Sequence, residues 1–134
     1  MPDPFKFELV SPERLLLSTE VEQVVVPGSE GEFTVLAYHA PVLTTLRPGV
    51  VDILAVGGER ARFFVRGGFA EVGPGGLTIL AETAVDLTEL DPGYLRQSIK
   101  DAEEDVQDAR TDVTRDRAQM KLDQLRQVQG ALNL

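Results

Sequence analysis

Residues 89–95 read Glu89-Leu90-Asp91-Pro92-Gly93-Tyr94-Leu95, and the character of the sequence changes within this stretch. All 8 prolines and 10 of the 12 glycines of the 134-residue chain lie at or before Pro92, and Gly130 is the only residue of either type after Gly93. Because Gly and Pro form turns and interrupt helices, the first part favours short strands and the second part favours helices. The sequence therefore predicts two domains, over residues 1–88 and 89–134.

The first domain is predicted to be an antiparallel β-sandwich, with a barrel as the related alternative. Phe5, Phe7 and Leu9 alternate with Lys6 and Glu8, as in a strand that has one buried and one exposed face. Similar short runs, bounded by turn residues at the spacing typical of all-β domains, cover residues 5–10, 21–26, 33–36, 50–56, 62–66, 69–72 and 77–81.

Three glycine pairs separate neighbouring runs of this domain: Gly57-Gly58, Gly67-Gly68 and Gly75-Gly76. Glycine adopts the positive φ angles that tight hairpin turns require, without the steric penalty of a side chain. Each pair is therefore predicted to be a hairpin turn between two strands.

The second domain has the period of helices. One apolar stripe, with spacings of 4, 3, 4, 3 and 4 residues, contains Leu95, Ile99, Ala102, Val106, Ala109 and Val113, and a second contains Ala118, Leu122, Leu125, Val128 and Leu132. Asp91 is a good N-cap and Pro92 suits the first helical position, so the first helix is predicted over residues 92–110. A turn is predicted at Thr111-Asp112-Val113-Thr114, where β-branched and capping residues interrupt the helix formers.

These features predict an antiparallel α-helical hairpin at the C-terminus. One continuous helix is the alternative, since neither Gly nor Pro enforces the break. The first stripe relies on alanines, whose burial contributes little free energy, so the hairpin is expected to be held weakly. Helices that detach and an ordinary static hairpin both remain open, and the residues by themselves favour the static hairpin.

The composition excludes several classes of function. A net charge of −9 and a pI near 4.5 repel nucleic-acid phosphates and anionic lipid headgroups, so neither nucleic acid nor a membrane surface is an expected partner. The acidity suits either simple solubility or a basic protein partner. No apolar run approaches the ~18 residues that span a bilayer, no targeting segment is recognisable, and without Cys nothing indicates an oxidising compartment. A cytosolic setting is expected.

No catalytic, cofactor or metal site is predicted. His39 is the only histidine, and no Gly-x-Ser-x-Gly elbow is present for a Ser-His-Asp triad. No Gly precedes a Lys, which excludes a Walker A phosphate loop. Glu30 and Glu32 flank Gly31 as the carboxylates of a metal site would, but the Ca²⁺-loop pattern is absent, and an exposed loop tip is the favoured interpretation.

The sequence around this loop carries a resemblance to a known family. Gly28-Ser29-Glu30-Gly31-Glu32-Phe33 is followed by His39-Ala40-Pro41 and then by Pro48-Gly49-Val50-Val51, and further matching stretches are Ser11-Pro12-Glu13-Arg14, residues 65–72 and residues 78–82. In this order, from about Phe5 to the end of the chain, they resemble the epsilon subunit of bacterial F-type ATP synthases. The acidic motif followed by His-Ala-Pro is highly specific.

The resemblance implies a β-sandwich joined to a C-terminal helical hairpin, in a non-catalytic subunit of the central stalk. In that family the sandwich binds the gamma subunit and the polar loops of the c-ring. The helices fold against the sandwich or extend along gamma into the catalytic alpha/beta hexamer, where they oppose ATP hydrolysis. The chain would then be peripheral on the cytoplasmic side of the bacterial inner membrane, associated with it only through the complex.

The same resemblance implies the site residues. The turn formed by Gly28, Ser29, Glu30, Gly31 and Glu32 corresponds to the loop that faces the c-ring, with the two carboxylates as partners of the ring loops. The gamma-facing segment corresponds to His39, Ala40, Pro41 and Thr44, and its histidine packs and hydrogen-bonds rather than catalyses. Ala37 and Tyr38 replace the proline and glycine usual before His-Ala-Pro, so a different local turn is expected.

Some family members bind ATP on the helices through a motif of Ile or Leu, Asp, two variable residues, Arg and Ala, with further arginines downstream. Leu90-Asp91 matches its start, but Tyr94 and Leu95 stand where Arg and Ala would follow, and an acidic stretch begins at Asp101 where a further Arg is expected. Without these guanidinium groups neither ATP binding nor strong inhibition by the helices is expected.

Two other classes of function remain as alternatives. One is a free-standing β-sandwich binding protein with a helical tail, whose sign would be a monomer that never co-purifies with a membrane complex. The other, more distant, is an enzyme, which would require a convergent pocket of titratable groups with shifted pKa values.

Overall fold

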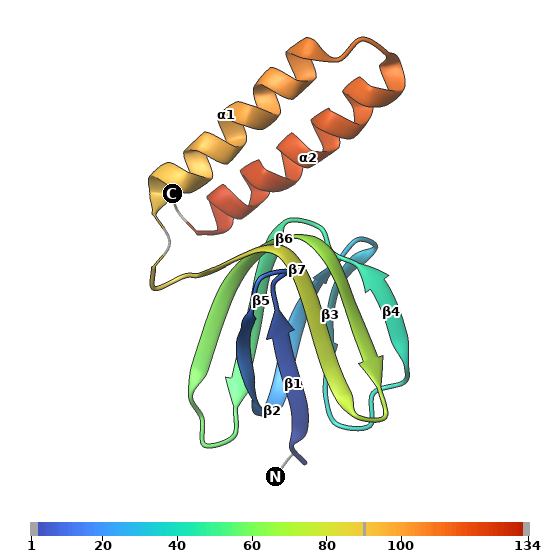
Figure 1. Cartoon of the computed structure of the whole chain (residues 1–134), viewed down its shortest axis with the longest axis vertical. Coiled ribbons are helices and arrows are strands. Elements are labelled where there is room, and N and C mark those ends of the chain that lie inside the picture. The colour runs from blue at the N-terminus through green and yellow to red at the C-terminus, as the bar shows by residue number, and fades with distance from the viewer. Residues whose placement is uncertain (1–2, 90, 133–134) are drawn as a thin grey trace. The chain divides into compact units, whose positions relative to one another are not determined.

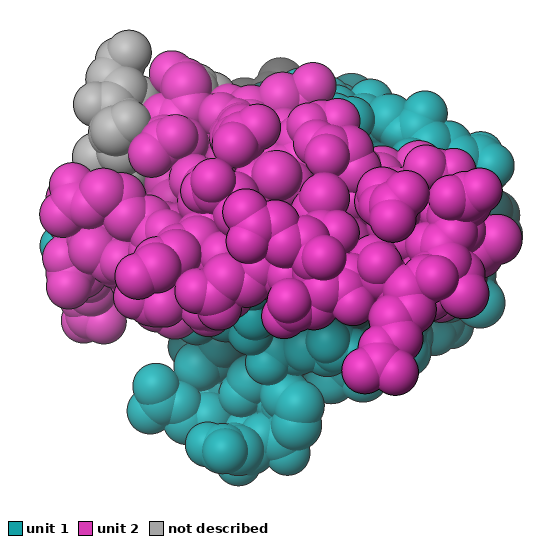
Figure 2. All heavy atoms as spheres, turned by 90° about the horizontal axis from the view of Figure 1, so that it is seen from above, with its two compact units in different colours: residues 1–88 teal, residues 89–134 magenta. Residues whose placement is uncertain are grey.

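The computed structural model describes residues 3–89 and 91–132, so Leu90, the first residue of the ATP-motif comparison, lies outside the described residues. The chain forms two compact units, Met1–Thr88 and Glu89–Leu134, which Figure 2 colours teal and magenta. The described part of the first unit contains seven strands, and that of the second contains two helices (Figure 1). The predicted fold class, a β-sandwich followed by a helical hairpin, is confirmed.

Most strands of the first unit pair in antiparallel fashion. In chain order they are β1 (Phe5–Val10), β2 (Leu15–Gly28), β3 (Gly31–Val35), β4 (Val42–Thr45), β5 (Gly49–Ala55), β6 (Arg60–Gly73) and β7 (Gly76–Asp86). Strands β1, β7, β6, β5 and β2 are neighbours in this order, and β1 also pairs with β2, which closes a ring of five strands. β3 is added to β2, and β4 is added to β6.

The longest strands contribute to both layers of the sandwich. The first half of β2 pairs with β1 and its second half pairs with β5 and β3, with an irregular register between Val21 and Gln23 where the partner changes. β6 likewise pairs with β5 through its first half and with β4 through its second half. The inward side chains form one core, which includes Phe7, Leu9, Val24, Val26, Val35, Ile53, Val65, Leu77 and Ile79. Phe7 and Leu9 are fully buried, which confirms the two-faced first strand.

Two of the three glycine pairs lie at hairpin turns. Gly57 and Gly58, both with positive φ, connect β5 to β6 as predicted. At the other end of β6, Gly73 pairs with Gly76, so the turn there consists of Pro74 and Gly75, one residue earlier than the predicted pair.

The prediction of a turn at Gly67-Gly68 is wrong. Both glycines lie inside β6, and the predicted runs 62–66 and 69–72 are one continuous strand. The register with β7 stays in phase across the pair, from Arg66 opposite Thr83 to Gly68 opposite Ala81. A Cβ atom on Gly68 would collide with the Leu80 carbonyl oxygen. Gly68 therefore permits close approach of two backbones rather than chain reversal.

The second unit consists of α1 (Pro92–Asp108) and α2 (Asp112–Ala131), which pack against each other as an antiparallel pair (Figure 1). Asp91 is the N-cap of α1, as predicted, and its carboxylate accepts a hydrogen bond of 2.8 Å from the Gly93 backbone N–H. The buried apolar residues are Leu95, Ile99 and Ala102 of α1 and Leu122, Leu125 and Val128 of α2. The hairpin is thus confirmed over the continuous helix.

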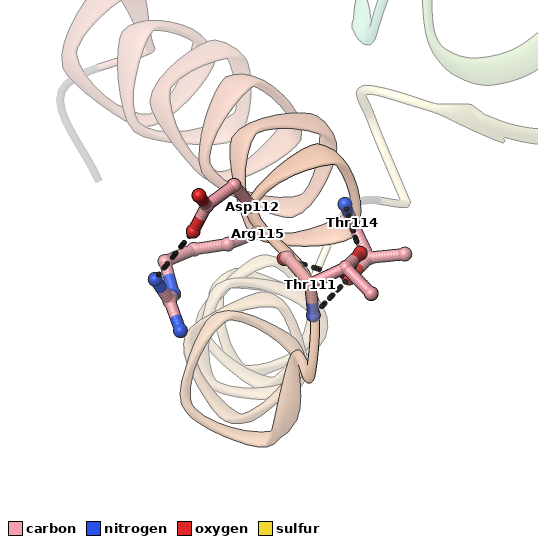
Figure 3. Close-up of polar contacts among 4 residues, drawn as sticks. All are labelled: Thr111, Asp112, Thr114 and Arg115. Atoms are coloured by element: carbon pink, nitrogen blue, oxygen red, sulfur yellow. Dashed lines mark hydrogen bonds and ion pairs between the residues drawn. The ribbon is translucent and has the colours of Figure 1, made fainter.

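The break between the helices begins earlier than predicted. α1 ends at Asp108, and Thr111 is the N-cap of α2. The Thr111 hydroxyl accepts a hydrogen bond of 3.1 Å from the Thr114 backbone N–H, while the Thr114 hydroxyl accepts one of 3.3 Å from the Thr111 backbone N–H (Figure 3). Val113, predicted on the stripe of the first helix, instead lies in the first turn of α2 and is 68% exposed. This reciprocal side-chain cap explains a break that has neither Gly nor Pro.

Candidate partner-binding site

The acidic turn is the tip of the β2–β3 hairpin. Gly28 pairs with Gly31, so Ser29 and Glu30 are the two turn residues, and both are exposed. Gly31 has a φ of 140°, and a Cβ atom on Gly28 would lie 2.9 Å from the Gly31 carbonyl oxygen. The flanking glycines therefore let the hairpin close tightly. With Glu32 also exposed, the hairpin tip presents two carboxylates to solvent.

The segment between β3 and β4 begins with a turn. The His39 backbone N–H donates a hydrogen bond of 3.2 Å to the Leu36 carbonyl oxygen, and Tyr38 has a φ of 64°. Tyr38 thus adopts a left-handed conformation, which glycine favours and other residues rarely adopt. Tyr38 is also 90% exposed. The His39 ring lies 6.1 Å from the Phe33 ring between centroids, and its Nδ1 is 2.7 Å from the Ala40 carbonyl oxygen. The histidine ring is therefore oriented by local contacts.

Hydrogen bonds join the acidic turn to the end of β4. The Ser29 backbone N–H donates to the Thr45 carbonyl oxygen at 2.9 Å, and the Thr45 hydroxyl donates to the Ser29 hydroxyl, also at 2.9 Å. Beside them, the Arg47 backbone N–H donates to the Pro27 carbonyl oxygen at 3.1 Å. The turn and β4 are thus fastened to each other at one end.

Most of the site residues predicted from the sequence line one of two separate grooves. A groove of about 530 Å³ is lined by residues 29–33 and 42–45, and so brings the acidic turn together with Thr44. A separate groove of about 360 Å³ is lined by His39 and Pro41 together with residues of β1 and of the β6–β7 turn. Ala40 is exposed and lines neither of these two grooves.

An ion pair with two-point geometry lies outside both grooves. Arg60 of β6 donates hydrogen bonds of 2.9 and 3.0 Å to the two carboxylate oxygens of Asp52 in β5. These hydrogen bonds and the charge of Asp52 raise the pKa of Arg60. Because Arg60 is exposed to solvent, the ion pair contributes little free energy, and it joins the neighbouring strands β5 and β6. In residues 3–89 and 91–132, no group of three or more His, Asp or Glu side chains gathers as metal ligands would.

Sequence reasoning missed β4 and the apolar side chains around it. Leu43 of β4 is 71% exposed and Phe69 of the adjoining β6 is 38% exposed. A signal was present in Val42-Leu43-Thr44-Thr45, where three of the four residues are β-branched. Prolines at positions 41 and 48 concealed it, because a stretch of six residues between two prolines resembles a loop.

The β unit matches a family profile described as "ATP synthase, Delta/Epsilon chain, beta-sandwich domain", over residues 4–87. The chain belongs to this ATP synthase delta/epsilon family. Curated relatives named ATP synthase epsilon chain extend the likeness over both units. The protein from Mesorhizobium japonicum is 51% identical and that from Chelativorans sp. is 52% identical, each over 132 residues that make up 98% of both chains. The resemblance to the epsilon subunit is thereby confirmed.

Solved ATP synthases contain chains with the same fold as this epsilon-family member. In the Euglena gracilis mitochondrial ATP synthase, described as OSCP/F1/c-ring, a chain aligns with a TM-score of 0.77 at 25% identity, covering 98% of this chain and 83% of that chain. In the Tetrahymena thermophila central stalk and c-ring, the TM-score is 0.72 at 17% identity, with 97% of both chains covered.

Neither helix, in its described residues, has the length and apolar character that a membrane crossing requires.

Proposed function

We propose that this chain is a non-catalytic part of the rotor of an F-type ATP synthase, where it couples proton translocation through the c-ring to ATP synthesis by way of gamma. The β unit, residues 1–88, binds the gamma subunit and the c-ring loops. The hairpin, residues 89–134, is the regulatory part that reaches the alpha/beta hexamer, where it does not inhibit ATP hydrolysis strongly. Support comes from relatives named ATP synthase epsilon chain, which align over 98% of both chains, and from the likeness to a chain of the Euglena assembly, which is described as OSCP/F1/c-ring.

The observation that carries this proposal is the link between the acidic turn and β4. Two hydrogen bonds of 2.9 Å between Ser29 and Thr45 hold the proposed ring-facing turn against the strand that contains Thr44, which is proposed to face gamma. A subunit that transmits torque between two partners has to keep its two contact surfaces in fixed relation. Surfaces joined by backbone hydrogen bonds within one sheet are held more precisely than surfaces on separate loops.

The proposed roles of the single residues follow from their exposure. Glu30 and Glu32 are exposed at the hairpin tip, available to accept hydrogen bonds from the ring loops without any rearrangement of the sheet. Ala40 and Pro41 are exposed beside the partly buried His39, and these three residues with Thr44 form the proposed gamma contact.

The helical hairpin is proposed to respond to gamma and the hexamer rather than to ATP. Tyr94 occupies the position of an arginine in ATP-binding relatives, and Asp101 accepts a hydrogen bond of 2.8 Å from the Gln97 side chain. No cofactor is proposed. The assembled complex would hold the chain at the cytoplasmic side of the bacterial inner membrane, as a peripheral subunit.

Pull-down with the cognate gamma subunit tests this function and its division between the units. Both the whole chain and the fragment of residues 1–88 are expected to retain gamma, because the fragment contains the complete sandwich and its core. A fragment that shows the circular dichroism of a folded β domain and yet fails to bind would refute the assignment of gamma to the β unit. A whole chain that stays monomeric and never co-purifies with the membrane complex would favour the free-standing binding protein.

A further inference from the structure

Strand β4 has an open edge. In the described residues β4 pairs with β6 on one side, and on the other side only Thr45 is linked, through its carbonyl oxygen and its hydroxyl, to Ser29. The Leu46 backbone N–H donates to the Gly68 carbonyl oxygen at 3.0 Å, toward β6, whereas the Thr45 carbonyl points the opposite way, to Ser29. Because backbone groups alternate in direction along an antiparallel strand, the N–H and C=O of Leu43 point the same way as those of Thr45. They face the open edge.

Strand β3 presents a second open edge on the opposite side of the same groove. The Pro27 carbonyl accepts its hydrogen bond from Arg47, which lies away from β3. Glu32 is opposite Pro27 in the register, so its backbone N–H and C=O point outward, as do those of Thr34 two residues later. The groove of about 530 Å³ therefore lies between two strand edges that have free hydrogen-bonding groups.

The two edges are protected to different degrees. Natural sheets guard open edges with charges, prolines or bulges, because a bare edge pairs readily with another chain. β3 carries the exposed carboxylate of Glu32, with Glu30 beside it. β4 (Val42–Thr45) is short and follows Pro41, but the strand itself contains no charge and no proline, its register with β6 is regular, and Leu43 is 71% exposed. β4 is therefore the less protected of the two edges and the one better suited to a partner strand.

We propose that an extended segment of the gamma subunit adds to β4 as a further strand, forming ladder hydrogen bonds with the N–H and C=O of Leu43 and with the N–H of Thr45. This inference rests on the proposed function, which assigns gamma to His39, Ala40, Pro41 and Thr44, and it adds Leu43 of the same strand. The added segment has an apolar side chain against Leu43 and no acidic residue where it passes Glu32 across the groove. Main-chain hydrogen bonds supply affinity, and the contact with Leu43 supplies specificity.

Amide hydrogen exchange of the whole chain, with and without excess gamma, tests the pairing directly. The Leu43 amide of the free chain bonds only water and is expected to exchange rapidly. In the complex its exchange is expected to slow by about 100-fold or more, because a ladder hydrogen bond must open before exchange occurs. The Thr34 amide, which faces outward from β3, serves as the internal control and is expected to change by less than about threefold.

Proline substitutions separate the backbone contribution from the side-chain contribution. Leu43→Pro removes an N–H that faces the open edge and leaves the ladder to β6 intact. Edge strands accept proline at positions whose N–H faces outward in this way. It is expected to weaken gamma binding about tenfold more than Leu43→Ala, which retains the N–H. The matched control is Thr34→Pro, the same change on the other open edge, which is expected to keep the affinity within about twofold.

Each result has a distinct meaning. Unchanged gamma affinity of a folded Leu43→Pro chain, or an unprotected Leu43 amide in the complex, would overturn strand addition while the proposed function stands. Failure of the unaltered chain to bind gamma would overturn both. Protection that rises with the concentration of the free chain and disappears when gamma is added would assign the edge to a second copy and overturn the proposal. If Leu43→Pro does not fold, the exchange measurement on the unaltered chain decides.

Discussion

Glycine is required at position 68 because the backbone of the neighbouring strand β7 lies against it, and not because the chain turns there. Gly68 has a φ of 99° inside β6, and an added Cβ atom would meet the backbone of Leu80 in β7. We predict that Gly68→Ala lowers the free energy of unfolding of the β unit by more than about 2 kcal/mol, because left-handed strain alone costs about 1–3 kcal/mol. Gly75→Ala is the control, since nothing lies within 4 Å of an added Cβ there. Urea unfolding followed by resonances of β6 and β7 measures both, and equal effects would contradict this account.

The two carboxylates of the acidic turn permit a test of the ring contact. Replacing Glu30 and Glu32 together by Gln is expected to change the unfolding free energy by less than about 0.5 kcal/mol, because both residues are exposed. The same change is expected to weaken reassembly of the rotor on c-ring membranes and to lower proton-coupled ATP synthesis. Glu13→Gln with Glu59→Gln removes the same charge from other exposed positions. If both double variants assembled equally well, the turn would be ordinary surface.

At the scale of elements, the hairpin depends on a cap made by two threonines. Thr111→Ala removes the hydroxyl that accepts the Thr114 N–H and is expected to destabilise α2 by about 1 kcal/mol. The chain contains no Cys, so spin labels can be attached through single cysteines introduced at the exposed positions 100 and 127. Since no Gly or Pro blocks helix formation between α1 and α2, we predict that the variant gains a population with the labels about 40 Å apart, the separation along one continuous helix.

The conservative variant at the same position provides the control for the cap. Thr111→Ser keeps a hydroxyl in place and is expected to retain the short label distance, since serine caps helices at least as well as threonine. Identical distance distributions for the Ala and Ser variants would show that packing between the helices, and not the cap, sets the bend.

At the scale of the whole molecule, net charge of −9 governs what the chain can bind. A triphosphate near α1 would meet Asp101, Glu103 and Glu104, which are all exposed, instead of a cluster of arginines. We predict no saturable heat on calorimetric titration of the isolated chain with MgATP up to about 1 mM, which corresponds to roughly −4 kcal/mol. A dissociation constant below that value would contradict the comparison with ATP-binding relatives.

Features that depend on neighbours in the chain could be predicted from the sequence. The change in Pro and Gly content near Pro92 located the start of the helices, and the Asp91 cap is local because its carboxylate reaches only to Gly93. Alternation in Phe5, Phe7 and Leu9 predicted a half-buried strand, since side chains along a strand alternate between faces. The acidic hairpin tip was likewise evident from glycines around two carboxylates. These effects act over a few residues, within reach of a sequence pattern.

Features that depend on residues far apart in the chain were decided only by the tertiary structure. Gly68 is inside a strand because the Leu80 backbone of β7 lies against it, and no pattern near Gly68 specifies that neighbour. β4 is a strand because β6 supplies its hydrogen bonds, which outweigh the prolines beside so short a run. Ser29 and Thr45 are 16 positions apart, and only the closed sandwich brings them within 2.9 Å. Long-range pairing fixes these features, because the groups that satisfy each backbone come from distant strands.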